Sequence, residues 1–421
     1  MEKPTLAAWL DRIGTEHPRG VERGLDRVRI VADRLGVVPP AAKTIVVAGT
    51  NGKGSTTAFA EHLLLAAGHS VGTTTSPHLH RFNERIHVNG GEVDDGTIVG
   101  AFESIESCRG SIDLSYFEYA TLAALLVMSR TPLDYAVLEV GLGGRLDAVN
   151  VVDADVAVIT SIGLDHQQYL GATREMIGGE KAGVMRPRVP VVCGDPNPPA
   201  SIVERARDLG APLLLATRDF GQRAGQLWIR SRDGSRLSLE LGGSSVDPVN
   251  AATAAMAVSQ AGYPVVQRTV AQAARTVRNP GRLEIVEQGG RTWVLDVAHN
   301  PHAAVFLADR LHALFADRTI RGVVGCLEDK DIAGIVAALR HQVTEFAYAA
   351  TTSARGRPAS ALRAAAGDPS AFAGTLDAAI THVLGRCESD GDVILALGSF
   401  DVVERVRVWL GYPRDACPQS P

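Results

Sequence analysis

Short runs of β-branched and aliphatic residues alternate along the first half of the chain with longer segments of helical spacing. The runs typical of buried strands are 44–49, 70–76, 135–141, 156–163 and 189–194. The segments with helical patterning are 53–67, 117–129 and 173–185. This alternation predicts an α/β domain with a mostly parallel, doubly wound sheet.

The pattern changes in the second half of the chain. Residues 225–241 alternate around Asp233-Gly234, which predicts a hairpin. The segment 279–286 contains Pro and Gly and suits a linker. The α/β rhythm then restarts, with a helix from about residue 302 and strands near 321–325, 345–350 and 392–397. Because 421 residues exceed one ordinary core, we expect two domains, 1–280 and a smaller Rossmann-like 281–421.

Composition narrows the function classes. The chain is 45% hydrophobic with a net charge of −5, which argues against a general nucleic-acid binder. Its five cysteines form no C-x-x-C pair, so neither a zinc knuckle nor a disulfide framework is indicated. No apolar run approaches the roughly 20 residues needed to span a membrane, and the N-terminus lacks a signal-peptide pattern. We expect a cytoplasmic protein with no membrane or nucleic-acid partner. With few aromatics and no coiled-coil pattern, a monomer is the default.

The stretch "VVAGTNGKGST" (46–56) joins a predicted strand to a predicted helix through a glycine-rich turn. It departs from the common phosphate-loop pattern, because Val47 and Gly54 stand where that pattern needs Gly and Ser or Thr. The physical elements are nevertheless present: glycines that let the backbone approach, a helix N-terminus, and the cation of Lys53. We therefore predict phosphate binding here, with Ser55 or Thr56 near a Mg²⁺ ion.

Two neighbouring strand ends carry candidate metal ligands. Glu139 lies within an apolar strand, where a carboxylate needs a partner or a metal. A salt bridge to Arg145 is the structural alternative. His166 follows the next strand and is either a ligand or a structural histidine. Ser76, at the end of the run 70–76, could supply another oxygen.

Lys181 lies in the helical stretch "GGEKAGV". The simplest interpretation is a solvated lysine. The alternative is a lysine of lowered pKa that reacts with CO₂ to give a carbamate, an anionic metal ligand. The residue pattern leaves both open.

A series of motifs appears in order along the chain: "VAGTNGKGST", "TSPHLHRFNERIHVNG", "LEVGLGGRLDAVN", "TSIGLDH", "GEKAGV", "NPGRLEIV", "LDVAHNPHAA" and "LEDKDIAG". Together they resemble the folylpolyglutamate synthase/dihydrofolate synthase family of the Mur ligase superfamily, over residues from about 5 to 410. The stretches 16–28 and 112–121 resemble the bifunctional bacterial type.

This resemblance implies an ATP-dependent amide ligase with an N-terminal ATPase domain and a C-terminal ligase domain. Members of the family phosphorylate a substrate carboxylate with ATP, and L-glutamate then attacks the acyl phosphate. The implied substrates are 7,8-dihydropteroate and reduced folates, and the implied cofactors are two Mg²⁺ ions.

The resemblance also assigns roles to individual positions. ATP contacts fall on Asn51, Gly52, Lys53, Gly54, Ser55, Thr56, Asn250, Arg282 and Asp296. Metal ligands fall on Ser76, Glu139, His166 and Lys181, the last as its carbamate. Catalytic roles fall on Lys53, Lys181, His166 and His299, and pterin-side contacts on Phe117, Asp147 and Ala148.

The family pattern is not matched everywhere. Many members have G-x-H-Q before the Asn-Ala-Ala run, where this chain has residues 244–249, "SSVDPV". Gln167-Gln168-Tyr169 also stands where Thr-Asp-Trp is common. The alternatives are a monofunctional folylpolyglutamate synthase, a Mur ligase for a cell-wall precursor, and a catalytically silent nucleotide-binding paralogue. The folate-type stretch "TSPHLHRFNERIHVNG" disfavours the cell-wall enzyme, and the filled catalytic positions disfavour the paralogue.

Overall fold

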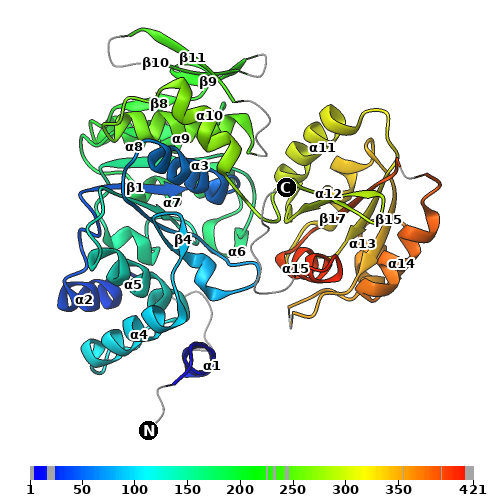
Figure 1. Cartoon of the computed structure of the whole chain (residues 1–421), viewed down its shortest axis with the longest axis horizontal. Coiled ribbons are helices and arrows are strands. Elements are labelled where there is room, and N and C mark those ends of the chain that lie inside the picture. The colour runs from blue at the N-terminus through cyan, green and yellow to red at the C-terminus, as the bar shows by residue number, and fades with distance from the viewer. Residues whose placement is uncertain are drawn as a thin grey trace. The chain divides into compact units, whose positions relative to one another are not determined.

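The computed structural model describes residues 4–16, 24–223, 226–230, 234–241, 246–353, 355–389 and 391–412. Most of the described chain up to residue 278 forms a first compact unit, and the chain from 279 onward forms a second (Figure 1). Two short segments, 79–81 and 164–166, belong to the second unit although they lie within the first half of the sequence. The sequence pattern does not predict that these two segments belong to the second unit.

The first unit is built on an eight-stranded sheet in the order β4-β3-β2-β5-β1-β6-β7-β8. Its strands are β1 (Lys43–Ala48), β2 (Val71–Thr74), β3 (Ile86–Val88), β4 (Gly91–Glu92), β5 (Tyr135–Glu139), β6 (Val156–Ile159), β7 (Val191–Cys193) and β8 (Leu213–Leu215). All neighbours from β2 to β8 pair in parallel, as predicted. β3 pairs antiparallel with both β2 and the edge strand β4, and Asn89 and Gly90, which both have positive φ, make the tight hairpin turn between β3 and β4.

Helices cover both faces of this sheet (Figure 1). The helices of the first unit are α1 (Leu6–Glu16), α2 (Asp26–Leu35), α3 (Lys53–Ala66), α4 (Asp95–Arg109), α5 (Tyr116–Ser129), α6 (Gln167–Leu170), α7 (Arg174–Lys181), α8 (Ala200–Asp208), α9 (Pro248–Gln260) and α10 (Gln267–Thr276), with the 3₁₀ turns η1 (Phe82–Arg85), η2 (Ala148–Val151) and η3 (Ala182–Val184). On β1, Ile45 and Val47 pack with α3, α9 and α10, whereas Val46 and Ala48 pack with α2, α4 and α5. The strand is therefore buried on both faces, which explains its continuous apolar run.

The hairpin predicted at residues 225–241 is part of a small antiparallel sheet, in the order β11-β10-β9. Its strands are β9 (Phe220–Arg223), β10 (Gln226–Arg230) and β11 (Arg236–Glu240). The pairing of β10 with β11 confirms the hairpin, although Asp233 at its turn lies outside the described residues. Apolar side chains of this sheet join the cluster that contains α3 and α9.

The second unit has a six-stranded sheet in the order β12-β13-β17-β14-β15-β16. Its elements are β12 (Glu284–Gln288), β13 (Arg291–Asp296), α11 (Pro301–Phe315), β14 (Ile320–Val324), α12 (Ile332–Leu339), β15 (Val343–Ala349), α13 (Ala359–Ala365), β16 (Ala373–Gly374), α14 (Leu376–Arg386), β17 (Val393–Leu397) and α15 (Phe400–Trp409). The linker predicted at 279–286 extends too far, because its last residues belong to β12, which begins at Glu284 and pairs antiparallel with β13. The other strand pairs are parallel.

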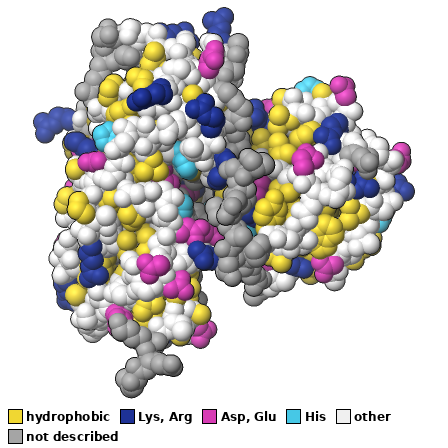
Figure 2. All heavy atoms as spheres, viewed as in Figure 1, with side chains coloured by type: hydrophobic (Ala, Val, Ile, Leu, Met, Phe, Trp, Pro, Cys, Tyr) yellow, Lys and Arg dark blue, Asp and Glu magenta, His cyan; other side chains and the backbone are white. Residues whose placement is uncertain are grey.

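Among the described helices, none has both the length and the apolar character to cross a lipid bilayer. On the face seen in Figure 2, basic and acidic side chains are interspersed. Four described cysteines are free thiols, and the fifth, Cys417, lies outside the described residues.

Candidate functional site

The glycine-rich turn between β1 and α3 is held in a conformation that only glycine adopts readily. Gly49 has φ +150° and Gly52 has φ +86°. A Cβ on Gly49 would lie 1.7 Å from Thr160 Oγ1, and one on Gly52 would lie 2.4 Å from Asn250 Oδ1. The side chain of Asn250 therefore lies against the loop, although 198 residues separate it from Gly52 in the sequence. The structure brings these two predicted nucleotide contacts together.

The helix α3 begins at Lys53, directly after this turn. Lys53 Nζ donates to the Thr50 carbonyl oxygen at 3.3 Å, so the ammonium group is folded back over the loop. The next residues, Ser55 and Thr56, are buried in the first turn of the helix. Thr56 Oγ1 has no hydrogen-bond partner among the described residues. The backbone of Asn51 is fixed by the Thr160 hydroxyl, which donates to its carbonyl oxygen at 2.7 Å.

Glu139, the last residue of β5, lies directly beside this loop. It is 5% exposed, and a Cβ on Gly54 would be 3.6 Å from its Oε2. The same oxygen accepts a hydrogen bond from the Ser76 backbone N–H at 3.1 Å. The salt bridge to Arg145 considered from the sequence is wrong, since Arg145 pairs with Glu180 at 2.8 Å. The buried Glu139 carboxylate lies next to the glycine-rich loop and is hydrogen-bonded to Ser76. Together these two residues present the hard oxygen ligands that Mg²⁺ prefers.

Lys181 is not a solvated lysine. It is 4% exposed at the end of α7, and its Nζ donates to the Gly49 carbonyl oxygen at 2.7 Å. The backbone of α7 at this point packs closely on the loop after β5, where a Cβ on Gly144 would lie 2.8 Å from the Lys181 carbonyl oxygen. The structure therefore places this amine at the start of the phosphate loop, in a site of low dielectric.

The three expected pterin-side residues lie in the loop after β5 and the helix that faces it. The ring of Phe117 covers Gly141, where a Cβ would be only 2.4 Å from its Cζ. Asp147 accepts backbone hydrogen bonds from Leu142 at 2.8 Å and from Val149 at 3.0 Å. Burial raises the pKa of Asp147 to about 6, although these hydrogen bonds and the charge of Lys53 oppose the shift. Ala148, which follows Asp147, is also buried and begins η2.

His166 belongs to the second unit, where its neighbour Asp165 forms a charged cluster that the sequence did not reveal. Asp165 contacts His299 Nε2 at 3.2 Å, Lys330 Nζ at 2.6 Å and Asn300 Nδ2 at 3.0 Å. Burial alone would raise the pKa of Asp165, but His299 and Lys330 hold it well below its usual range. The motifs "TSIGLDH" and "LEDKDIAG" contain Asp165 and Lys330, but no spacing rule links residues so far apart.

Arg282 and Asp296 also belong to the second unit. Asp296 accepts backbone hydrogen bonds from Leu283 and Ala298, both at 2.7 Å. Burial raises the pKa of Asp296, and the charge of Arg282 counteracts that rise. The Arg282 guanidinium lies 5.2 Å from the centroid of the Phe400 ring. The two predicted nucleotide contacts are therefore close enough to interact electrostatically.

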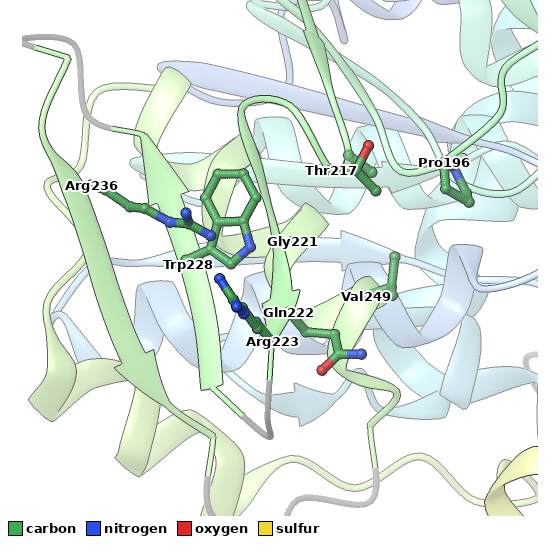
Figure 3. A pocket seen from close by; sticks show the side chains of 9 residues that line it. Pro196, Thr217, Gly221, Gln222, Arg223, Trp228, Arg236 and Val249 are labelled. Carbon is green, nitrogen blue, oxygen red and sulfur yellow. The ribbon is translucent and has the colours of Figure 1, made fainter.

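A separate pocket of about 310 Å³ lies against the small antiparallel sheet of the first unit (Figure 3). Trp228 and Arg236 stack within it, with the guanidinium 3.7 Å from a ring centroid of the indole. Thr217 and Val249 line its other side, and Val249 immediately precedes Asn250. None of the residues assigned to the site from the sequence lines this pocket.

Comparison with protein families finds two domain models along the chain. Residues 47–187 match the Mur ligase middle domain, which covers the phosphate loop, Glu139 and Lys181. Residues 281–400 match the Mur ligase glutamate ligase domain, which covers Arg282 and Asp296. The family models therefore contain most of the residues described above.

Individual relatives align along nearly the whole chain. Dihydrofolate synthase/folylpolyglutamate synthase of Escherichia coli (strain K12) is 42% identical over 414 residues, covering 95% of this chain and 94% of the relative. The solved structure of E. coli FolC with DHPP and ADP has a TM-score of 0.91 at 40% identity, covering 97% and 98% of the two chains. A bifunctional folylpolyglutamate synthase/dihydrofolate synthase with Mn, AMPPNP and L-glutamate bound has a TM-score of 0.87 at 40% identity, covering 97% and 100%.

Proposed function

We propose that this chain, which belongs to the dihydrofolate synthase/folylpolyglutamate synthase family of Mur ligases, is an ATP-dependent ligase that forms amide bonds to L-glutamate. It joins L-glutamate to 7,8-dihydropteroate and adds further glutamates to reduced folates. The observation that carries the proposal is the buried Glu139 carboxylate beside Gly54 of the phosphate loop, with the Lys181 amine on the Gly49 carbonyl. These groups can hold phosphates and a divalent cation together.

The reaction has two steps. An oxygen of the substrate carboxylate attacks the γ-phosphorus of ATP, and ADP leaves. The amine of L-glutamate then attacks the carbonyl carbon of the acyl phosphate, loses a proton and expels phosphate. The first step brings two anions together, so Lys53 and the N–H groups at the start of α3 reduce the repulsion and orient the phosphates.

The family resemblance makes Ser76 and Glu139 ligands of one Mg²⁺ and His166 a ligand of a second, and it makes carbamylated Lys181 a further metal ligand. In the first unit the donor set fits a Mg²⁺ ion, because the buried Glu139 carboxylate lies beside the glycine-rich loop and accepts the Ser76 N–H, and carboxylate and hydroxyl oxygens are hard ligands. When bound, the ions would neutralise charge on the phosphates. The chain itself positions Glu139 through the Ser76 N–H and excludes water from Lys181 by burying it.

In the second unit, Arg282 and Asp296 serve the nucleotide, and His299 acts near the reacting groups. Asp165 positions His299 through its Nε2 atom, while Nδ1 lies 2.8 Å from the Val297 carbonyl oxygen. The imidazole is thereby fixed at both ring nitrogens. Its orientation is set before any substrate arrives.

The function is tested by ADP release with ATP, L-glutamate and either 7,8-dihydropteroate or tetrahydrofolate. Glutamate-dependent release with both acceptors is the expected result. Release with tetrahydrofolate alone would instead indicate a monofunctional folylpolyglutamate synthase. No glutamate-dependent release with either acceptor would overturn the proposal in favour of a silent nucleotide-binding paralogue.

The expected monomer is tested by light scattering on the purified protein. The expected cytoplasmic location is tested by fractionation of the source cells.

The carbamate at Lys181 has its own test. Turnover should fall when CO₂ and bicarbonate are removed and return when they are restored. The reason is that the carbamate of Lys181 offers an anionic oxygen to a metal cation, whereas the free amine does not. Lys181→Ala should lose turnover by orders of magnitude at every bicarbonate level. Lys43→Ala, at an exposed lysine paired with Asp155, is the control and should keep the wild-type response. Full activity of Lys181→Ala would refute the carbamate.

A further inference from the structure

Arg85 is a cation of the first unit that no step above uses. It is the last residue of η1, immediately before β3. Its carbonyl oxygen accepts a hydrogen bond from the Thr75 N–H at 3.1 Å, one residue before Ser76. The Ser76 N–H in turn donates to Glu139. The backbone of Arg85 is therefore fixed beside the pair of residues proposed to hold a metal.

The Arg85 side chain is enclosed on the faces that aromatic rings can cover. Its guanidinium carbon lies 5.6 Å from the centroid of Phe82 and 5.8 Å from that of Tyr116. Those two rings meet edge to face at 6.2 Å. Arg85 Nε donates to His78 Nδ1 at 2.8 Å, which fixes the rotation of the group. The guanidinium is thus held in one orientation by three neighbouring side chains.

The terminal nitrogens of Arg85 have no hydrogen-bond or ion-pair partner within the part of the chain that the structure describes. They are also not sealed in the core, since neither is among the fully buried unsatisfied atoms. Burial lowers the pKa of Arg85, and the nearby Tyr116, Glu139 and Glu84 oppose that effect. Cation–π contacts contribute only about 0.5–2 kcal/mol, which is small against the cost of desolvating an ion. An anion from a ligand would complete the site.

The position of Arg85 identifies which anion it meets. Tyr116 precedes Phe117, whose ring covers Gly141 on the pterin side, and Glu139 lies on the phosphate side. If the pterin of the substrate lies at Phe117 and its reacting carboxylate lies near the phosphate loop, that carboxylate lies between Phe117 and Glu139. We propose that Arg85 binds the reacting carboxylate of the folate-type substrate through its two terminal nitrogens, an inference that rests on the proposed function. Arginine suits this role, because its planar fork matches both carboxylate oxygens.

This role has a consequence for specificity. The carboxylate must be held while it attacks phosphorus, and a two-point contact leaves one lone pair of an oxygen aimed away from the guanidinium. An analogue of the substrate without the carboxyl group cannot use Arg85. Arg85 therefore determines the preference for the carboxylated ligand, whereas Phe117 serves both ligands equally.

The test measures binding of 7,8-dihydropteroate and of its analogue with hydrogen in place of the carboxyl group. Wild-type protein should prefer the carboxylated ligand, and Arg85→Met should lose on the order of 10- to 100-fold of that preference. Arg85→Lys should recover part of it. Arg130→Met, at an exposed arginine that donates to Ser104, is the control and should keep the wild-type preference. In turnover, Arg85→Met should raise KM for dihydropteroate and leave KM for ATP unchanged.

The outcomes separate this inference from the proposed function. If Arg85→Met weakens the binding of both ligands by the same factor, Arg85 only supports the aromatic rings and the inference is overturned. The same holds if the wild-type protein shows no preference between the ligands. Thermal unfolding and ADP affinity of each variant report whether it is folded. Absence of glutamate-dependent ADP release by the wild-type protein would instead refute the proposed function, whatever the binding comparison shows.

Discussion

Asp147 should make the stability of the protein depend on pH in a way that Asp147→Asn removes. The carboxyl is 6% exposed, and both of its oxygens accept backbone N–H groups, from Leu142 and Val149. Burial raises its pKa from 3.8 to about 6. Because the folded state holds this proton more tightly, the stabilising contribution is complete below pH about 4. It is lost as the pH rises through about 6.

The magnitude follows from the two pKa values. The full loss is about 3 kcal/mol, from roughly 2 pKa units at 1.36 kcal/mol each. Of this loss in the free energy of unfolding, about 1.4 kcal/mol occurs between pH 5 and pH 8, which is a tenfold change in the unfolding equilibrium constant. Asparagine has no charge to desolvate, but it offers only one acceptor to two N–H donors. Relative to the protonated carboxyl, that change costs about 1–3 kcal/mol, and this cost does not depend on pH.

Urea unfolding of both proteins at several pH values between 5 and 8 measures this difference. The free energy of unfolding of the wild-type protein, relative to that of Asp147→Asn, should fall by about 1.4 kcal/mol between pH 5 and pH 8. Asp26→Asn is the matched control, because the Asp26 side chain is 98% exposed. A gap that stays constant over this range would refute the reasoning, since the carboxyl would then not titrate there.

Two substitutions test the glycines of the site. Gly52→Ala should weaken ADP binding at least tenfold by calorimetry, because φ is +86° and the new Cβ would lie 2.4 Å from Asn250 Oδ1; unchanged affinity would contradict the contact. Gly141→Ala should raise KM for 7,8-dihydropteroate, because a Cβ at 2.4 Å displaces the Phe117 ring and overpacking costs about 1–3 kcal/mol. Adding Phe117→Leu should relieve the crowding, so a double variant no more stable to heat than Gly141→Ala would count against this geometry.

Local sequence determined most of the first-unit sheet and the glycine-rich turn after β1. The apolar run of β1 is continuous because both faces of the strand are buried, and the glycines after it read directly as a turn that needs positive φ. The hairpin of β10 and β11 also followed from alternation. These features depend on residues that are neighbours in the chain, so a single sequence contains the whole signal.

Motif resemblance extended the prediction to residues far apart, but it could not supply their contacts. Asn250 against Gly52, and Lys181 on the Gly49 carbonyl, depend on how α9 and α7 pack around the loop. A salt bridge between Glu139 and Arg145 was the structural alternative that the sequence left open. Only the tertiary structure decided it, by pairing Arg145 with Glu180.

The charged groups show the same division. Sequence identified Glu139 as a carboxylate in an apolar strand, but it gave no signal for Asp165 with Lys330, or for Arg85 between two rings. Charge, burial and partner are properties of three-dimensional surroundings, and residues many positions apart create them. The sequence by itself therefore determined which chemical groups this protein has at its strand ends. The tertiary structure decided which of them are buried and which are paired.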